Sequence, residues 1–247
     1  MPVPRRLLLW LTYGSLAPVL FTGIYLIEGA ARPGYDGWRH SISALSLGPG
    51  GWLQQANFVL LGINVLIVAI VWRRVLAGGV GATWYPLLRG VEGFSLVLIG
   101  LFATDPEPGY PPGSAPVQAF STVHGIVHFA CLFAIIFAMM AGLLVMARRF
   151  WGDRHWRGWV LYSVVSALLI NLLIALFGVA NSHDFEYAGV MERLATNVEA
   201  IWGLALLARL WAGVPFMSVP GSTATAGGPG ELAWRLRRPP PPRAGRS

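Results

Sequence analysis

The chain has 247 residues, of which 55% are hydrophobic and only 12% are charged. Soluble domains carry roughly a quarter of charged residues, so this composition excludes an ordinary soluble enzyme and indicates an integral membrane protein whose main partner is the lipid bilayer. The net charge of +7 is not a sign of nucleic-acid binding, because all 18 basic residues are arginine and most stand at the ends of apolar runs, where they orient helices in a bilayer.

Six apolar segments are each long enough to cross a bilayer as a helix, which takes about 20 mainly apolar residues. In chain order they are residues 7–27, 52–72, 85–103, 120–146, 159–180 and 192–211. Glycine and proline are frequent between them, and these residues end helices and favour exposed turns. The first segment follows Arg5 and Arg6, but it is too long for a signal peptide and lacks a small-residue cleavage site, so we expect it to be retained.

The distribution of the arginines predicts one orientation for these six segments, because loops kept in the cytoplasm accumulate arginine and lysine. The arginine pairs at 5–6, 73–74 and 148–149 and the basic tail all fall on one side of a six-span topology. The sequence therefore predicts an all-α polytopic membrane bundle over residues 1–213, with six transmembrane helices and both termini in the cytoplasm. Residues 214–247, rich in glycine, proline and arginine, are predicted to be a disordered cytoplasmic tail.

The ionisable and polar residues gather on the opposite, outer side, in the loops and at the ends of the predicted helices. Ionisable groups within spans are costly unless they face a cavity or one another, so such a gathering indicates a site. We predict an outward-facing polar pocket that binds a small molecule or a lipid headgroup, and we expect its contacts to be Asp36, Arg39, His40, Ser43, Arg193 and Asn197. For the turn that holds Ser41 and Ser43, helix capping is an alternative to ligand contact.

His124 and His128 are one helical turn apart at the head of the fourth segment, so both rings share one helix face. An i, i+4 histidine pair can hold a metal ion, and an acidic residue or a further histidine from another span would complete a zinc site with an open position for water. We predict Asp105 and His183 as the completing ligands. The alternative is a pair of neutral rings that are hydrogen-bonded between helices.

Two charged groups fall inside the predicted spans, away from the outer cluster. Glu92 lies within the third segment with Arg89 one turn before it, so the two could form an ion pair within one helix. Glu199 lies in the last segment, seven residues after Glu192 and on roughly the same face. A polar track through the bundle is one interpretation, and an internal ion pair plus one satisfied carboxyl is the other. The asparagines at 57, 64 and 171 are expected to form hydrogen bonds between helices.

Four stretches follow one another in a specific order: "GYDGWRHSISALSLGPGGWLQQANFVLLG", "FATDPEPGYPP", "STVHGIVH" and the "ER" at the head of the last segment. This ordered set resembles the DUF998 family of predicted bacterial and archaeal integral membrane proteins. The resemblance implies a location in a bacterial or archaeal cell membrane and no assigned activity. A remoter likeness is to membrane hydrolases of the alkaline ceramidase and adiponectin-receptor type, but the chain has six predicted spans where those have seven, and its histidine pair lies in the fourth.

Three classes of function follow from these observations. The first is a non-catalytic membrane protein with a ligand-binding outer pocket. The second is a zinc-dependent hydrolase of lipid amides or esters, in which Glu192 or Asp184 would move the proton and Ser41 would contact the bound carbonyl or hydroxide. The third is a haem-bearing electron carrier, which is disfavoured because the inner half of the bundle has no histidine within a span.

Overall fold

A computed structural model describes residues 3–114, 121–183 and 186–216 of the chain. These residues form six long helices, two short 3₁₀ helices and no strand, which confirms the all-α class. The elements are α1 (Arg5–Ala31), η1 (Ser43–Ser46), α2 (Gly51–Val75), α3 (Trp84–Leu101), α4 (Val123–Phe150), η2 (Arg154–Trp156), α5 (Arg157–Ser182) and α6 (Ala188–Trp211).

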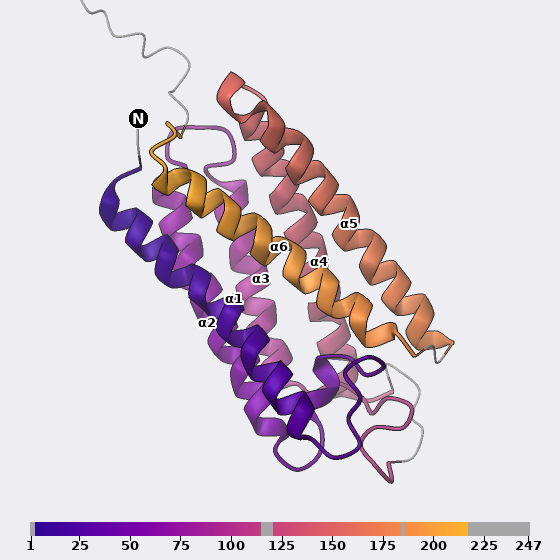
Figure 1. Cartoon of the computed structure of the whole chain (residues 1–247). Coiled ribbons are helices and arrows are strands. Elements are labelled where there is room, and N and C mark those ends of the chain that lie inside the picture. Colours follow the sequence, from indigo (N-terminus) through magenta and orange to yellow (C-terminus); the bar gives the residue numbers. More distant parts are fainter. Residues whose placement is uncertain (1–2, 115–120, 184–185, 217–247) are drawn as a thin grey trace, which may run out of the picture. The chain divides into compact units, whose positions relative to one another are not determined.

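The helices form a closed ring in which each packs mainly against its neighbours in the sequence, and α1 packs against α6 (Figure 1). The contact between α1 and α6 is the least extensive around the ring. It is made near both ends, where Trp211 Nε1 donates to Thr12 Oγ1 at 3.0 Å and Asn197 Nδ2 donates to the Tyr25 hydroxyl at 3.2 Å. Between these two points, residues of α1 and α6 such as Ser15, Pro18 and Gly203 line an internal cavity. The contact between α1 and α6 is called the α1–α6 seam below.

Glycines bring the backbones of α2 and α3 into direct contact. A Cβ atom at Gly62 would stand 2.6 Å from the Gly93 carbonyl oxygen, and a Cβ at Gly93 would stand 2.8 Å from the Gly62 carbonyl oxygen. About two turns further along α3, a Cβ at Gly100 would meet the Gln55 carbonyl oxygen at 2.6 Å. Small residues at such positions allow helices to approach closely within a bilayer, so these glycines set the α2–α3 distance.

One end of the bundle is rich in arginine and aromatic side chains. Arg149 NH1 donates to the Val80 carbonyl oxygen at 2.8 Å, and Arg209 NH2 donates to the His155 carbonyl oxygen at 2.5 Å. Phe216 is buried against Phe150 and lies beneath the Arg149 guanidinium, 5.0 Å from it. The folded unit therefore extends to Phe216, three residues beyond the predicted boundary, while the rest of the predicted tail lies outside the described residues.

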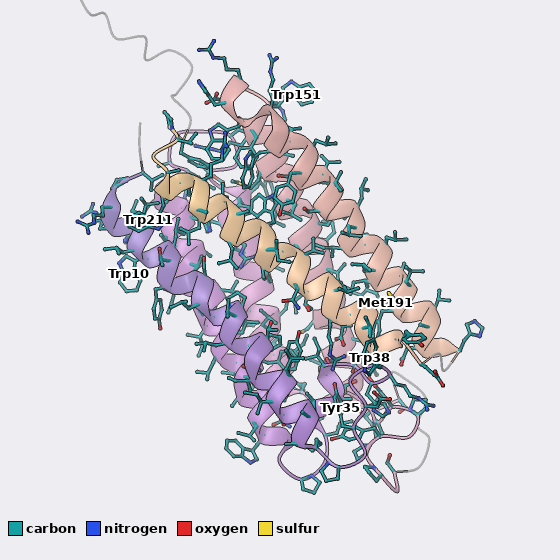
Figure 2. All side chains as sticks on the ribbon, in the orientation of Figure 1. Trp10, Tyr35, Trp38, Trp151, Met191 and Trp211 are labelled. Atoms are coloured by element: carbon teal, nitrogen blue, oxygen red, sulfur yellow. The ribbon has the colours of Figure 1, made fainter. Side chains whose placement is uncertain are left out.

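The outer surface of the helices is apolar and suits a bilayer. Four helices, α1, α2, α4 and the α5 region, are long and apolar enough to cross a membrane by length and composition. Exposed tryptophans stand at both ends of the bundle (Figure 2), as expected where side chains meet the two membrane interfaces; they include Trp10, Trp38, Trp151 and Trp211. The helices α3 and α6 fall outside that group of four, and both carry charged side chains within the helix.

The helix boundaries differ from the predicted segments by up to four residues. The helix α6 begins at Ala188, four residues before the predicted start, because Gly189 and Val190 donate backbone hydrogen bonds to the loop at Arg39 and Trp38. The helix α4 begins at Val123 rather than at residue 120, because the Thr122 side chain caps it by accepting from the Gly125 amide at 3.0 Å. These contacts cannot be found from apolar periodicity alone.

Candidate functional site

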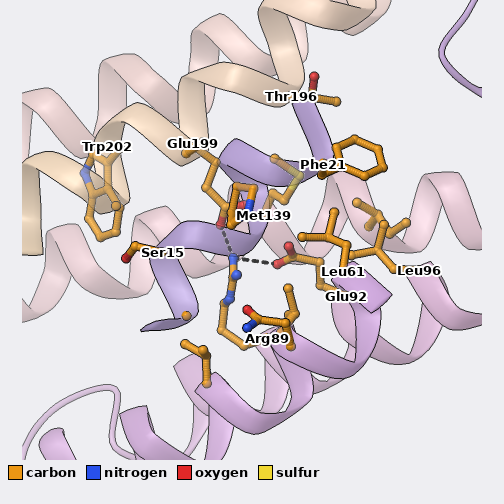
Figure 3. Close-up of a pocket in the computed structure, with 18 of the residues that line it drawn as sticks. Ser15, Phe21, Leu61, Arg89, Glu92, Leu96, Met139, Thr196, Glu199 and Trp202 are labelled. Carbon is orange, nitrogen blue, oxygen red and sulfur yellow. Dashed lines mark hydrogen bonds and ion pairs between the residues drawn. The ribbon is translucent and has the colours of Figure 1, made fainter. Parts of the chain in front are cut away.

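A cavity with a volume of about 180 Å³ lies inside the ring of helices. Its walls come from α1, α2, α3, α4, α6 and η1, and most of the lining side chains are aliphatic or aromatic. Figure 3 shows this cavity, with Phe21, Leu61, Leu96, Met139 and Trp202 pointing toward it from different helices. A concave, mainly apolar site with a few polar groups is the usual form of a small-molecule site.

Three ionisable side chains stand together in the cavity wall (Figure 3). Arg89 NH1 lies 2.5 Å from Glu199 Oε1 and 2.8 Å from Glu92 Oε2, so one guanidinium on α3 joins a carboxylate from its own helix to one from α6. The ion pair between Arg89 and Glu92 agrees with the interpretation of the sequence. Glu199 is part of the same cluster, which the sequence did not reveal.

The cluster is incompletely hydrogen-bonded. Among the described residues, Glu92 Oε2 and Arg89 Nε are buried and have no hydrogen bond, although Glu92 Oε2 remains in ion-pair contact with Arg89. Most buried polar atoms in proteins have a partner, and exceptions often mark functional sites. The side chain of Glu92 is buried, with 5% of the residue exposed.

The most exposed part of the cavity wall belongs to α1 and α6. Thr196 and Leu204 of α6 are exposed, Ser15 and Pro18 of α1 are half-buried, and Gly203 leaves open space where a side chain would stand. The lining residues of α3 and α4 are buried or half-buried. The cavity is therefore most accessible at the α1–α6 seam.

Ser43 of η1 lies in the cavity wall and is joined to His128. The Ser43 Oγ atom is 2.9 Å from His128 Nε2, and His128 Nδ1 is 2.8 Å from the Phe102 carbonyl oxygen. Because that carbonyl can only accept, Nδ1 carries the proton and donates, and the neutral ring accepts the Ser43 hydroxyl at Nε2. His128 therefore links three elements: η1, the C-terminal end of α3, and its own helix α4. This agrees with the alternative interpretation of the sequence, in which the histidine rings are neutral and hydrogen-bonded between helices.

The predicted metal ligands are not brought together as a set. His124 and His183 are exposed, whereas His128 is buried with both ring nitrogens hydrogen-bonded. Asp105 Oδ2 accepts from the Ser121 amide at 3.0 Å and Asp105 Oδ1 accepts from the Thr122 hydroxyl at 2.5 Å, so its carboxylate fastens the beginning of α4. Within the part of the chain that the structure describes, no three His, Cys, Asp or Glu side chains are placed to hold a metal ion.

The loop between α1 and α2 is held by two acidic side chains. Glu192 is buried, and its Oε2 accepts from the Ile42 amide at 2.6 Å while the residue also lines the cavity. Glu107 accepts from the Ser41 hydroxyl and, at 3.0 Å, from the Ser41 amide. Burial raises the pKa of Glu107, and the hydrogen bonds from Ser41 oppose that rise. The Ser41 hydroxyl oxygen also accepts from the Ala44 amide at 3.0 Å, next to the start of η1, whose N-cap residue is Ile42.

The predicted ligand contacts of the outer loop lie near one another, but several of them bind the loop itself. Arg193 NH1 donates to the His40 carbonyl oxygen at 3.0 Å, and Arg193 NH2 donates to the Tyr35 hydroxyl at 2.5 Å. His40 Nδ1 accepts from the Asp36 amide at 3.0 Å. The carbonyl of Arg39 accepts from Gly189 at 3.0 Å, and Asp184 lies outside the described residues.

A second, more open groove with a volume of about 570 Å³ lies between the end of α1, the α1–α2 loop and the first turns of α6. Asp36, Trp38, Tyr25 and Arg193 are among its lining residues. Two of the predicted headgroup contacts, Asp36 and Arg193, therefore share a groove, whereas Ser43 faces the internal cavity and Asn197 bridges α6 to α1.

The asparagine predictions have mixed outcomes. Asn57 Nδ2 donates to the Phe21 carbonyl oxygen at 3.1 Å and so links α2 to α1, as expected. Asn171 Nδ2 instead donates to Ala167 within its own helix at 2.8 Å, so the prediction of an interhelical bond is wrong there. Asn64 is buried and lines the cavity.

The internal cavity was not predicted, nor was the position of His128 relative to it. The sequence predicted an outward-facing polar pocket and one shared helix face for His124 and His128. Neither ring is among the described side chains that line the cavity, but Ser43, which does line it, is hydrogen-bonded to His128. The charges at Arg89, Glu92 and Glu199 within apolar segments were the signal that could have located the cavity.

Comparison with protein families gives one result and comparison with individual proteins gives none. The model of the DUF998 family, described as "Protein of unknown function", matches residues 15–209. No match was found among curated proteins or among solved structures, so the likeness to ceramidase-type hydrolases has no support. The match covers all of α2 to α5 and most of α1 and α6, and the chain therefore belongs to the DUF998 family of proteins of unknown function.

Proposed function

We propose that all six helices cross a bacterial or archaeal cell membrane, with both termini in the cytoplasm. The charged helices α3 and α6 complete the ring with α1, α2, α4 and α5. At 18 residues, α3 is about 27 Å long, close to the thickness of a bilayer's hydrocarbon core of roughly 30 Å. Its charges face the cavity rather than lipid, which is the arrangement that makes charges tolerable within a span.

This topology predicts opposite labelling of cysteines at the two ends of the bundle. In a Cys131→Ala background, Ser114→Cys and Ala77→Cys each place one thiol at an exposed position. A membrane-impermeant maleimide applied to intact cells is expected to label the variant at Ser114 and not the variant at Ala77 until the cells are opened. Labelling of the Ala77 variant in intact cells would refute the orientation.

We infer that the function of the protein is to bind a small amphipathic molecule in the internal cavity, entering through the α1–α6 seam. The observation that carries this inference is the cavity itself, which is apolar over most of its wall and contains the Arg89, Glu92 and Glu199 cluster. The most exposed lining residues lie at the seam, where a molecule dissolved in the bilayer would reach it. The outer groove is a second place for the polar part of a lipid.

Filling the cavity at Gly203 is expected to abolish ligand binding. Gly203 lines the cavity and a Cβ there meets nothing within 4 Å, so Gly203→Phe places a ring in open space. Gly178 of α5 also has open space around it but does not line the cavity, and Gly178→Phe is the matched control. The measurement is equilibrium dialysis of radiolabelled benzyltrimethylammonium, neopentylbenzene and phenylmethanesulfonate against nanodiscs containing each variant.

If the cavity binds ligands, nanodiscs with the wild type or with Gly178→Phe should take up at least one of the three probes in excess of empty nanodiscs. Nanodiscs with Gly203→Phe should show no such excess. Equal uptake by all variants and by empty nanodiscs would mean that the probes only partition into lipid. That result would overturn the proposed function.

A second candidate function rests on the Ser43–His128 pair. A serine hydroxyl that donates to a histidine, with the other ring nitrogen fixed by an acceptor, is the arrangement of a nucleophile and its base. In an acyl transfer, Ser43 Oγ would bond to the carbonyl carbon, its proton would pass to His128 Nε2, and the leaving alcohol would take that proton. Water would then release the acyl group by the reverse transfer.

This candidate predicts covalent modification of Ser43 by an alkyl fluorophosphonate that is soluble in the bilayer. Mass spectrometry should find the adduct on Ser43 in the wild type and in Ser46→Ala, and should find none in His128→Gln. Unmodified Ser43 in the wild type, under conditions where a cavity probe binds, would leave the pair with a structural role only.

A further inference from the structure

The charges in the cavity wall do not balance. Arg89 contributes one positive charge, and Glu92 and Glu199 contribute two carboxylates within ion-pair distance of it. The cluster therefore carries a formal charge of −1 when all three groups are ionised. Glu192 also lines the cavity and adds a further carboxylate.

We propose that the ligand of this cavity is a lipophilic cation, such as an amine or a quaternary ammonium with an apolar body, and that its charge is held beside Glu92 and Glu199. The proposal rests on the proposed function and specifies the class of ligand. A negative charge surrounded by apolar groups is costly unless it is paired, and a cation of this kind supplies the missing pair. Glu92 Oε2 is buried, and its one contact among the described residues is the ion pair with Arg89 NH1 at 2.8 Å, without a hydrogen bond. Glu92 and Glu199 both line the cavity, so a cation there would lie beside the two carboxylates.

The aromatic lining suits the same ligand. Tyr85, Trp72, Trp202 and Phe21 are among the residues that form the wall, and Figure 3 shows Trp202 and Phe21 on opposite sides of the ion cluster. Aromatic faces attract cations, most strongly where water is excluded. An anionic ligand would meet two carboxylates whose single guanidinium partner is already shared between them.

The arrangement also discriminates between ligands of the same shape. A neutral molecule of equal size would fill the apolar volume but leave the excess carboxylate unpaired. Benzyltrimethylammonium and neopentylbenzene differ only by the exchange of the quaternary nitrogen for carbon, and phenylmethanesulfonate presents a negative group on a similar apolar body. A comparison of these three therefore isolates the sign of the charge.

The experiment compares the affinities of the three probes for four proteins in nanodiscs, by the same dialysis measurement. For the wild type, we expect benzyltrimethylammonium to bind at least about tenfold more tightly than neopentylbenzene, and phenylmethanesulfonate to bind least. Glu199→Gln makes the cluster formally neutral, so the preference for the cation should fall to about that of a purely apolar cavity. Glu186→Gln removes a carboxyl from an exposed position outside the cavity and should leave the preference unchanged.

The fourth protein, Gly203→Phe, separates the two proposals. If the neutral probe binds the wild type as tightly as the cation, and both are lost in Gly203→Phe, the cavity binds ligands but the charge proposal is wrong. If the cation preference survives in Glu199→Gln and is also seen in Gly203→Phe, the cation is bound elsewhere and the proposal is likewise overturned. If no probe binds any variant above empty nanodiscs, the proposed function itself fails.

Discussion

Replacement of Arg89 by leucine is expected to lower the free energy of unfolding by about 3–5 kcal/mol, the loss seen when one partner of a buried ion pair is removed. Arg89 is the only cation within ion-pair distance of Glu92 and Glu199 among the described residues. Without it, two carboxylates would face each other in a cavity that excludes most water. The variant should give little folded protein, measured as the midpoint of unfolding in SDS titrations and as the monodisperse fraction in mild detergent.

Matched variants distinguish lost charge pairing from lost packing. Glu199→Gln leaves Arg89 paired with Glu92, so no buried charge loses its only partner and the free energy of unfolding should fall by about 1 kcal/mol, the net contribution of one hydrogen bond. The triple variant Arg89→Leu/Glu92→Gln/Glu199→Gln removes all three charges and should recover most of the stability lost in Arg89→Leu, because apolar or neutral replacements of whole buried ion clusters are often tolerated. A triple variant as unstable as Arg89→Leu would show that the guanidinium acts through packing instead.

Substitution of Gly93 by alanine is expected to cost about 2–3 kcal/mol of stability, at the upper part of the range for overpacked sites. The added methyl would lie 2.8 Å from the Gly62 carbonyl oxygen and 3.0 Å from the Leu66 amide nitrogen. Both are backbone atoms of α2, so no side-chain rotation relieves the contact and the helices must separate. The midpoint of thermal unfolding in detergent, followed by tryptophan fluorescence, reports the effect.

Gly90 provides the control for this prediction within the same helix. A Cβ at Gly90 meets nothing within 4 Å, and alanine is the better helix former by about 1 kcal/mol in a helix interior. Gly90→Ala should therefore be neutral or slightly stabilising, while Gly93→Ala, three residues later, is destabilising. Equal effects at the two positions would contradict the close α2–α3 contact.

Much of the fold follows from local sequence signals. Each of the six helices overlaps a predicted apolar segment, because length and hydropathy are properties of a continuous stretch of chain. The ion pair between Arg89 and Glu92 was predictable for the same reason, since residues three apart on a helix are neighbours. The hydrogen bond from the Ala44 amide to the Ser41 hydroxyl is local as well, since it joins residues three apart.

The candidate site depends on contacts between residues far apart in the sequence, and most of these contacts could not be predicted from the sequence alone. Glu199 joins Arg89 across 110 positions, and Ser43 meets His128 across 85. A helical face common to His124 and His128 was correctly deduced from spacing, but spacing does not tell which residue is covered by a loop. His128 is buried under η1 while His124 is exposed, and this difference arises from the packing of η1.

The most direct test of the account is photolabelling of the protein in nanodiscs with 4-azidobenzyltrimethylammonium, followed by mass spectrometry of the adducts. Binding in the cavity predicts adducts on its wall, with Leu61, Met139 and Trp202 as the diagnostic positions, and predicts that excess benzyltrimethylammonium suppresses them. Adducts confined to exposed residues of α5 such as Leu168 and Leu172, or adducts that the competitor does not reduce, would contradict a ligand site inside the helix ring.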